Sequence, residues 1–68
     1  MQVTVNGETR EIEETLTAEQ LIERLGLAGR RLAMEVNGEI LPRSRYAEHR
    51  FRPGDRIEIV QAIGGGCR

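Results

Sequence analysis

Two Asn-Gly dipeptides constrain the fold of this chain of 68 residues more than any other feature. Asn-Gly suits a type I′ hairpin turn, because both central residues of that turn need a positive φ angle. Before Asn6-Gly7, Val3 and Val5 alternate with polar residues, which is typical of a strand with one buried face. A second hairpin is expected at Asn37-Gly38. The sequence therefore predicts two hairpins, separated by about thirty residues that must connect them.

The connecting segment carries the start and stop signals of a helix. Thr17 and Gln20 fit a capping box, with Leu16 and Leu21 placed for a hydrophobic staple. The apolar residues that follow recur at helical spacing and form one stripe: Ala18, Leu21, Ile22 and Leu25. Gly26 suits the residue that ends a helix. We expect a helix over residues 18–25.

The remaining segments complete an α+β fold. Further strands are predicted over residues 9–12, 32–37, 39–41 and 56–62, with a helical turn over 44–49 and a turn at Pro53-Gly54-Asp55. The last strand, with Ile57 and Ile59 in the core, is expected to lie centrally beside the first. A helix that crosses over one sheet face then gives a β-grasp (ubiquitin-like) fold, with a mixed four- to five-stranded sheet and one main helix on one face. We assign residues 1–63 to this domain and residues 64–68 to a flexible Gly-rich tail.

Composition excludes several classes of function. The 10 basic and 11 acidic residues nearly balance, which argues against nucleic-acid binding. No apolar run approaches the length of a membrane span, and no signal-peptide pattern opens the chain. We therefore expect a cytoplasmic protein with no membrane or nucleic-acid partner. His49 is the only histidine, without ligands at metal-binding spacing, so it is interpreted as a surface residue and no metal site is predicted.

The sequence resembles a known family over nearly the whole chain. Four stretches are similar to the ThiS family, the sulfur carriers of thiamin biosynthesis: residues 1–7, 36–43, 54–60 and 61–66. Members of that family end at the second glycine of a diglycine, whereas here Cys67 and Arg68 follow Gly66. Three explanations stay open for that extension: removal by a peptidase, an addition made for expression, or an unusual natural end. Cys67 is interpreted as removable or incidental rather than catalytic.

The resemblance implies a reaction at one carboxylate, and a chain that is a co-substrate rather than an enzyme. After removal of Cys67 and Arg68, a ubiquitin-activating-type adenylyltransferase (ThiF-like) would adenylate Gly66, using ATP and Mg²⁺ that this chain does not bind itself. A cysteine desulfurase or persulfide donor would then convert the adenylate to a thiocarboxylate. A thiazole synthase (ThiG-like) would accept the sulfur.

Several residues before Gly66 are expected to contact these partners. Glycines lack Cβ and pass through a narrow channel easily. The predicted partner-binding residues are Gly64, Gly65, Ile63, Ala62, Val60 and Arg43. Arg43 belongs to an arginine cluster with Arg45, Arg50 and Arg52. The cluster either steers an acidic partner surface or only balances the acidic residues 11–14.

Three other functions stay open at this stage. The chain is alternatively a peptidase-processed sulfur carrier for molybdopterin, cysteine, methionine or a secondary metabolite, a ubiquitin-like modifier of target lysines, or an interaction module without tail chemistry.

Overall fold

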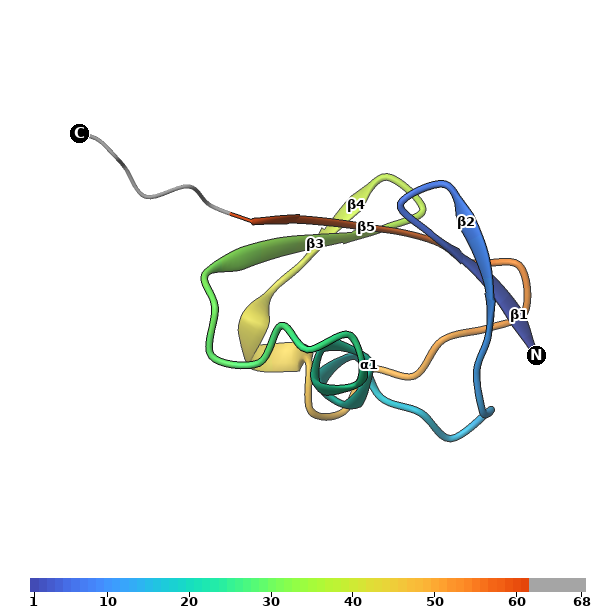
Figure 1. Ribbon diagram of the computed structural model, residues 1–68, viewed down its shortest axis with the longest axis horizontal. Coiled ribbons are helices and arrows are strands. Elements are labelled where there is room, and N and C mark those ends of the chain that lie inside the picture. Colours follow the sequence, from blue (N-terminus) through green and yellow to red (C-terminus); the bar gives the residue numbers. More distant parts are fainter. Residues whose placement is uncertain (62–68) are drawn as a thin grey trace.

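The computed structural model describes residues 1–61, with the elements in the order drawn in Figure 1. They are β1 (Gln2–Val5), β2 (Glu8–Glu11), α1 (Ala18–Arg24), β3 (Leu32–Val36), β4 (Glu39–Leu41), the 3₁₀ helix η1 (Arg43–Arg45) and β5 (Arg56–Gln61). The predicted strands are confirmed with boundaries that shift by about one residue, except that Ala62 at the end of the last strand lies outside the described residues.

Both hairpins form as predicted. Asn6 and Gly7 have φ angles of 51° and 84°, and Asn37 and Gly38 have φ angles of 53° and 85°. Positive φ at both central positions is the geometry of a type I′ turn, whose twist matches that of the flanking strands. β1 therefore pairs with β2, and β3 pairs with β4, in antiparallel ladders.

Helix α1 begins and ends at the predicted signals. The Thr17 hydroxyl accepts a hydrogen bond from the Gln20 N–H at 3.2 Å, and the Gln20 side chain accepts one from the Thr17 N–H at 3.0 Å. Gly26 has a φ of 76°. Its N–H donates to the Glu23 carbonyl at 3.0 Å, and the Leu27 N–H donates to the Ile22 carbonyl at 2.9 Å. These two bonds are a Schellman motif, which satisfies carbonyls that the helix end would leave unpaired.

The sheet has the strand order β2-β1-β5-β3-β4. β5 lies between β1, to which it is parallel, and β3, to which it is antiparallel. In Figure 1 the sheet is seen nearly edge-on, with α1 and η1 on one side of it and no described element on the other. The predicted α+β fold of the β-grasp type, with a mixed five-stranded sheet and one main helix on one face, is confirmed.

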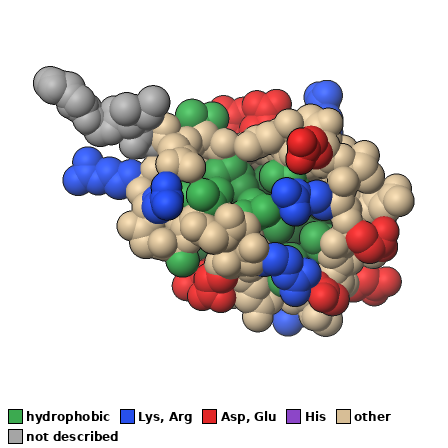
Figure 2. Space-filling view, viewed as in Figure 1, with side chains coloured by type: hydrophobic (Ala, Val, Ile, Leu, Met, Phe, Trp, Pro, Cys, Tyr) green, Lys and Arg blue, Asp and Glu red, His purple; other side chains and the backbone are tan. Residues whose placement is uncertain are grey.

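The core fills the space between the sheet and α1. Its buried residues come from β1, α1, β3, β5 and the segments before α1 and before β5: Val3, Val5, Ile12, Leu16, Ala18, Leu21, Ile22, Met34, Tyr46, Phe51, Ile57 and Ile59. Figure 2 shows hydrophobic side chains in the middle of one side of the molecule, surrounded by arginine and acidic side chains. A thin core that partly reaches the surface is expected at this size.

The segment between β4 and β5 contributes more to the core than its irregular sequence suggests. Tyr46 and Phe51, the two aromatic residues, are both buried. The carbonyls of Tyr46 and His49 accept hydrogen bonds from the N–H groups of Glu19 and Ala18 at 3.0 and 2.9 Å. These bonds satisfy donors at the start of α1, which a helix cannot satisfy by itself. The helical turn predicted over residues 44–49 is present only as η1, which begins one residue earlier and ends at Arg45.

The predicted turn before β5 is also present. Gly54 has a φ of 84°, and the Asp55 N–H donates to the Arg52 carbonyl at 3.1 Å.

In the part of the chain that the structure describes, no helix is long and apolar enough to cross a membrane.

Candidate functional site

The candidate site lies where β5 leads out of the sheet toward the glycines. Residues of β5 alternate between the two faces, as strand geometry requires. Ile57 and Ile59 are 1% and 7% exposed and pack under the sheet against the core. Val60 is 63% exposed. The prediction that Ile57 and Ile59 belong to the core is therefore confirmed, and Val60 points away from the face that the helix covers.

The outward side chains of three adjacent strands form one surface, which we call the open face. Ala33 on β3 pairs with Val60, and Glu35 on β3 lies between its partners Ile40 on β4 and Glu58 on β5. Ile40 is 69% exposed. The open face thus consists of Ala33, Glu35, Ile40, Arg56, Glu58 and Val60, which are three apolar side chains with two carboxylates and one arginine.

Arg43 lies at the edge of the open face. A nitrogen of its guanidinium donates a hydrogen bond to the Arg30 carbonyl at 2.9 Å, which holds the side chain against the segment before β3. Arg43 and Val60 line the same shallow hollow of about 430 Å³, together with Arg31, Leu32 and Ala33. The structure therefore brings together two of the residues that the sequence predicts to bind a partner.

The strand that carries Val60 is held in register by the two hairpin asparagines. The Asn6 side-chain oxygen accepts from the Ile59 N–H at 2.8 Å, and its amide donates to the Ile59 carbonyl at 3.2 Å. The Asn37 side-chain oxygen accepts from the Arg56 N–H at 2.9 Å. Each asparagine thus serves a turn and also fixes β5. Because a shift of one residue would reverse the two faces of the strand, these bonds keep Val60 on the open face.

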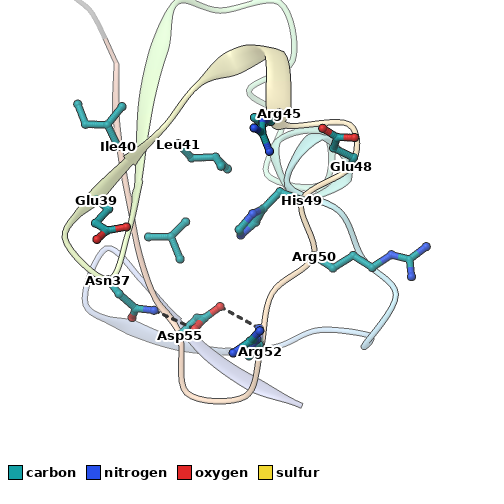
Figure 3. Close-up of a pocket in the computed structure, with 11 residues that line it drawn as sticks. Asn37, Glu39, Ile40, Leu41, Arg45, Glu48, His49, Arg50, Arg52 and Asp55 are labelled. Carbon is teal, nitrogen blue, oxygen red and sulfur yellow. Dashed lines mark hydrogen bonds between the residues drawn. The ribbon is translucent and has the colours of Figure 1, made fainter.

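The other arginines of the predicted cluster lie elsewhere. Arg45, Arg50 and Arg52 line a hollow of about 780 Å³ between β4 and the segment that precedes β5 (Figure 3). Asp55 in this hollow accepts hydrogen bonds from the Asn37 amide at 3.0 Å and the Arg52 N–H at 2.8 Å. The structure does not join these arginines to Arg43 in one partner surface.

His49 points into the same hollow in Figure 3. It is partly buried rather than a plain surface residue, because its ring packs edge-on against Phe51 with centroids 5.1 Å apart. Its buried Nε2 has no hydrogen-bond partner among the described residues. Within residues 1–61, no group of three His, Cys, Asp or Glu side chains is placed to hold a metal ion. The absence of a bound metal or cofactor stays a prediction.

Two of the three glutamates in residues 11–14 pair with groups other than the arginine cluster. Glu11 pairs with the N-terminal ammonium at 2.8 Å, and Glu13 pairs with Arg24 at 2.7 Å. The hydrogen bond from Arg24 lowers the pKa of the Glu13 carboxyl below its ordinary value. The explanation that the cluster balances this acidic run is therefore not supported by contacts within residues 1–61.

The other predicted site residues lie outside the described residues. They are Ala62, Ile63, Gly64, Gly65 and Gly66, with Cys67 and Arg68 after them. The domain boundary predicted at residue 63 and the predicted tail also fall in this part of the chain.

Sequence reasoning missed most residues of the site region: Arg31, Ala33, Glu35, Ile40, Arg56 and Glu58. A signal for the residues on β3 and β4 was available. A two-residue turn at Asn37-Gly38 makes Val36 and Glu39 partners, and counting outward from this pair places Ile40 opposite Glu35. Ala33 then lies on the same face, two residues before Glu35.

The family model described as the ThiS family matches residues 3–66 of this chain. The chain belongs to the ThiS family. The match runs through β5 and on to Gly66. It therefore covers both the fold and the glycines that the sequence analysis singled out.

Known members support this family assignment over their full length. The "Sulfur carrier protein ThiS" of Escherichia coli is 32% identical over 66 residues, which are 97% of this chain and 100% of that protein. The crystal structure of the thiamine biosynthesis protein ThiS from Geobacter metallireducens superposes with a TM-score of 0.82 at 32% identity, covering 97% of this chain and 100% of that one.

A second kind of relative is much longer. A "Thiazole synthase" of Paramagnetospirillum magneticum is 44% identical over 66 residues, and one of Magnetococcus marinus is 36% identical over 66 residues. In both cases the match covers 97% of this chain but only 20% of the relative. The chain thus spans about a fifth of the length of these curated relatives.

Proposed function

We propose that this chain is a sulfur carrier of thiamin biosynthesis, which carries sulfur as a thiocarboxylate at Gly66. The observation that carries the proposal is the match to the ThiS family through Gly66, together with full-length similarity to a sulfur carrier. The described residues contribute a support for the chain end, since β5 pairs with β1 at Arg56 and Ile57 and with β3 as far as Gln61. In this role the chain is a co-substrate, and the acids, bases and metal ions belong to its partners.

The chemistry requires a terminal carboxylate that other proteins can reach. An oxygen of the Gly66 carboxylate attacks the α-phosphorus of ATP, pyrophosphate leaves, and an acyl adenylate forms. A sulfur nucleophile then attacks the acyl carbon and AMP leaves. The attacking atoms must approach to about 3–3.5 Å, and a glycine at this position leaves the approach unhindered by a side chain.

The activating partner docks on the open face in this proposal. Val60 and Ile40 are the large hydrophobic residues that are most exposed in the described chain. An exposed apolar surface beside a reactive chain end is a typical docking site. Arg43 at its edge adds a positive charge held in place by the bond to Arg30. The partner is an adenylyltransferase of the ubiquitin-activating type, which supplies the ATP and Mg²⁺ site.

A thiazole synthase is the proposed acceptor of the sulfur. The two thiazole synthases that match this chain carry a similar segment within a longer polypeptide. A segment joined covalently to its partner has a high effective concentration there, so such a fusion favours transfer between the two parts. The same pairing between separate proteins is the simplest expectation for this chain.

The experiment is a reconstitution with the adenylyltransferase from the same organism. The chain ending at Gly66 is incubated with enzyme, ATP, Mg²⁺ and sulfide, and its intact mass is measured. We expect the mass increase of one oxygen-to-sulfur exchange, dependent on ATP. A matched chain that retains Cys67 and Arg68 should show no exchange until those residues are removed. An unchanged mass with an enzyme that is active on its own carrier would contradict the proposal.

Arg43 gives a sharper test of docking. Arg43→Gln removes the charge, and we expect the KM for the carrier to rise about tenfold. Because the hydrogen bond to Arg30 links exposed groups, the urea midpoint should change little. Arg50→Gln removes a charge from the separate hollow and is the control. Equal KM values for the two variants would refute a role for Arg43 in docking.

A further inference from the structure

Two carboxylates stand directly opposite each other on the open face. Glu35 on β3 and Glu58 on β5 are register partners. Their strand neighbours Met34 and Ile59 are buried on the covered face, so both glutamates project from the other face. In an antiparallel sheet the Cβ atoms of such partners lie about 5 Å apart. Nothing in the alternation of the strands requires acidic residues at these two positions.

Neither glutamate of this pair forms an ion pair within the described chain. Like charges at directly opposite positions destabilise a sheet. Among residues 1–61 the ion pairs are those of Glu11 with the N-terminus and of Glu13 with Arg24. Arg56, which shares the strand and face of Glu58, forms no ion pair with either glutamate. Glu35 is also partly buried, which reduces the screening of its charge by salt.

Apolar side chains border the pair on two sides, and Arg56 lies toward the start of β5. Ile40 lies on the far side of Glu35, and Ala33 and Val60 form the next row of the same face. A protein that covers this surface excludes water from the carboxylates. Buried carboxylates without a partner are costly, so the covering protein must supply a cation.

We propose that the activating enzyme places one arginine or lysine side chain between Glu35 and Glu58 when it docks on the open face. This inference rests on the proposed function and specifies the chemistry of its partner. Arginine fits best, because its planar guanidinium can donate hydrogen bonds to both carboxylates. A second copy of this chain is a poor occupant, because face-to-face packing would bring four carboxylates together.

The opposite charge at the other end of the site fixes the orientation of the complex. Arg31 and Arg43 line the hollow beside Val60, whereas the two glutamates lie one row further from the end of β5. The enzyme surface should therefore have acidic groups near the arginines and a basic group near the glutamates. Complementary charges in this arrangement favour one docking direction over its reverse.

The test measures the affinity of the chain for its adenylyltransferase at low and high salt. The variants are Glu35→Gln, Glu58→Gln and the double variant, with Glu14→Gln as an exposed control outside the site. We expect each single variant to bind about tenfold more weakly at low salt, with a weaker salt dependence. The control should bind like the parent chain.

Urea unfolding of the free variants separates binding from folding. Removal of one charge from a like-charged pair should leave the midpoint equal to that of the parent or higher. Weaker binding by a chain that is equally or more stable is a result that damage to the fold does not give.

The outcomes distinguish this inference from the proposed function. If the parent chain binds and acquires sulfur but both glutamine variants bind as tightly as it does, the proposed cation is wrong. The glutamates would then only prevent self-association, which sedimentation would show as dimers of the double variant. If the parent chain neither binds nor acquires sulfur, the proposed function and this inference both fail.

Discussion

The two faces of the sheet differ in chemistry although the same strands build them. On the covered face, Met34 and Ile59 are 0% and 7% exposed and pack toward α1. One residue further along each strand, Glu35 and Val60 project from the open face. Alternate residues of β3 and β5 thus contribute to the core and to the surface that we propose binds the partner. A change on one face should therefore affect one property and spare the other.

The largest expected effect comes from removing a buried side chain on the covered face. Ile59→Ala removes a buried side chain from the central strand and should lower the free energy of unfolding by about 2–5 kcal/mol. The adjacent change Val60→Ala removes an exposed side chain and should cost about 0.5 kcal/mol or less. Urea unfolding measures both values. Similar losses for the two variants would contradict the division between the faces.

The second largest effect tests what holds β5 in register, so that Ile59 stays on the covered face and Val60 on the open face. Asn6→Gly retains a residue that tolerates positive φ but removes both side-chain hydrogen bonds to Ile59. At about 0.5–1.5 kcal/mol per bond, we expect a loss of about 2 kcal/mol in urea unfolding. Asn37→Gly is the matched comparison: it also removes two side-chain hydrogen bonds, to Asp55 and Arg56, but these are exposed, so it should cost less. If the control were the more damaging change, the register of β5 would not depend chiefly on Asn6.

A smaller effect tests whether the partner contacts the open face. Val60→Ser removes apolar surface without adding charge. We expect it to lower kcat/KM for thiocarboxylate formation about tenfold, as for a central interface contact, with little change in the urea midpoint. Glu14→Gln should leave both quantities unchanged. Wild-type kinetics for Val60→Ser would show that the partner does not cover this surface.

The smallest expected effect concerns the exposed ion pair between Glu13 and Arg24. Because Arg24 lowers the pKa of Glu13 in the folded chain, the pair stabilises the fold above the pKa of the unfolded state. That contribution disappears as the pH falls through the lower folded pKa. Glu13→Gln should therefore reduce the loss of stability at acidic pH, as seen in thermal melts across pH 3–7 (a window set by the ordinary glutamate pKa of about 4.3). Identical pH profiles would mean that the exposed pair contributes nothing measurable.

Local signals in the sequence were sufficient for most of the fold. The Asn-Gly turns, the capping box at Thr17 and the glycine after α1 each act within a few residues, and all are present in the structure. The position of β5 beside β1 followed from the need for a crossover over one face. These features are predictable because each depends on the backbone preferences of a short segment.

Contacts between distant segments were not predictable in the same way. The burial of Tyr46 and Phe51 depends on how an irregular segment folds under the sheet, and such a segment has no periodicity to reveal its inner side. The bonds of Asn6 to Ile59 join residues that are far apart in sequence. In the site, Val60 and Arg43 were identified, whereas Ala33 and Ile40 required the register of the second hairpin.

The central position of β5 has a mechanical consequence. An enzyme that draws the end of this chain toward its own reactive centre exerts tension along β5. The ladder with β3 runs along β5 to Gln61 and the ladder with β1 holds its first two residues, so the load is shared by rows of hydrogen bonds that resist sliding together. A strand at the margin of the sheet would instead be peeled away one bond at a time.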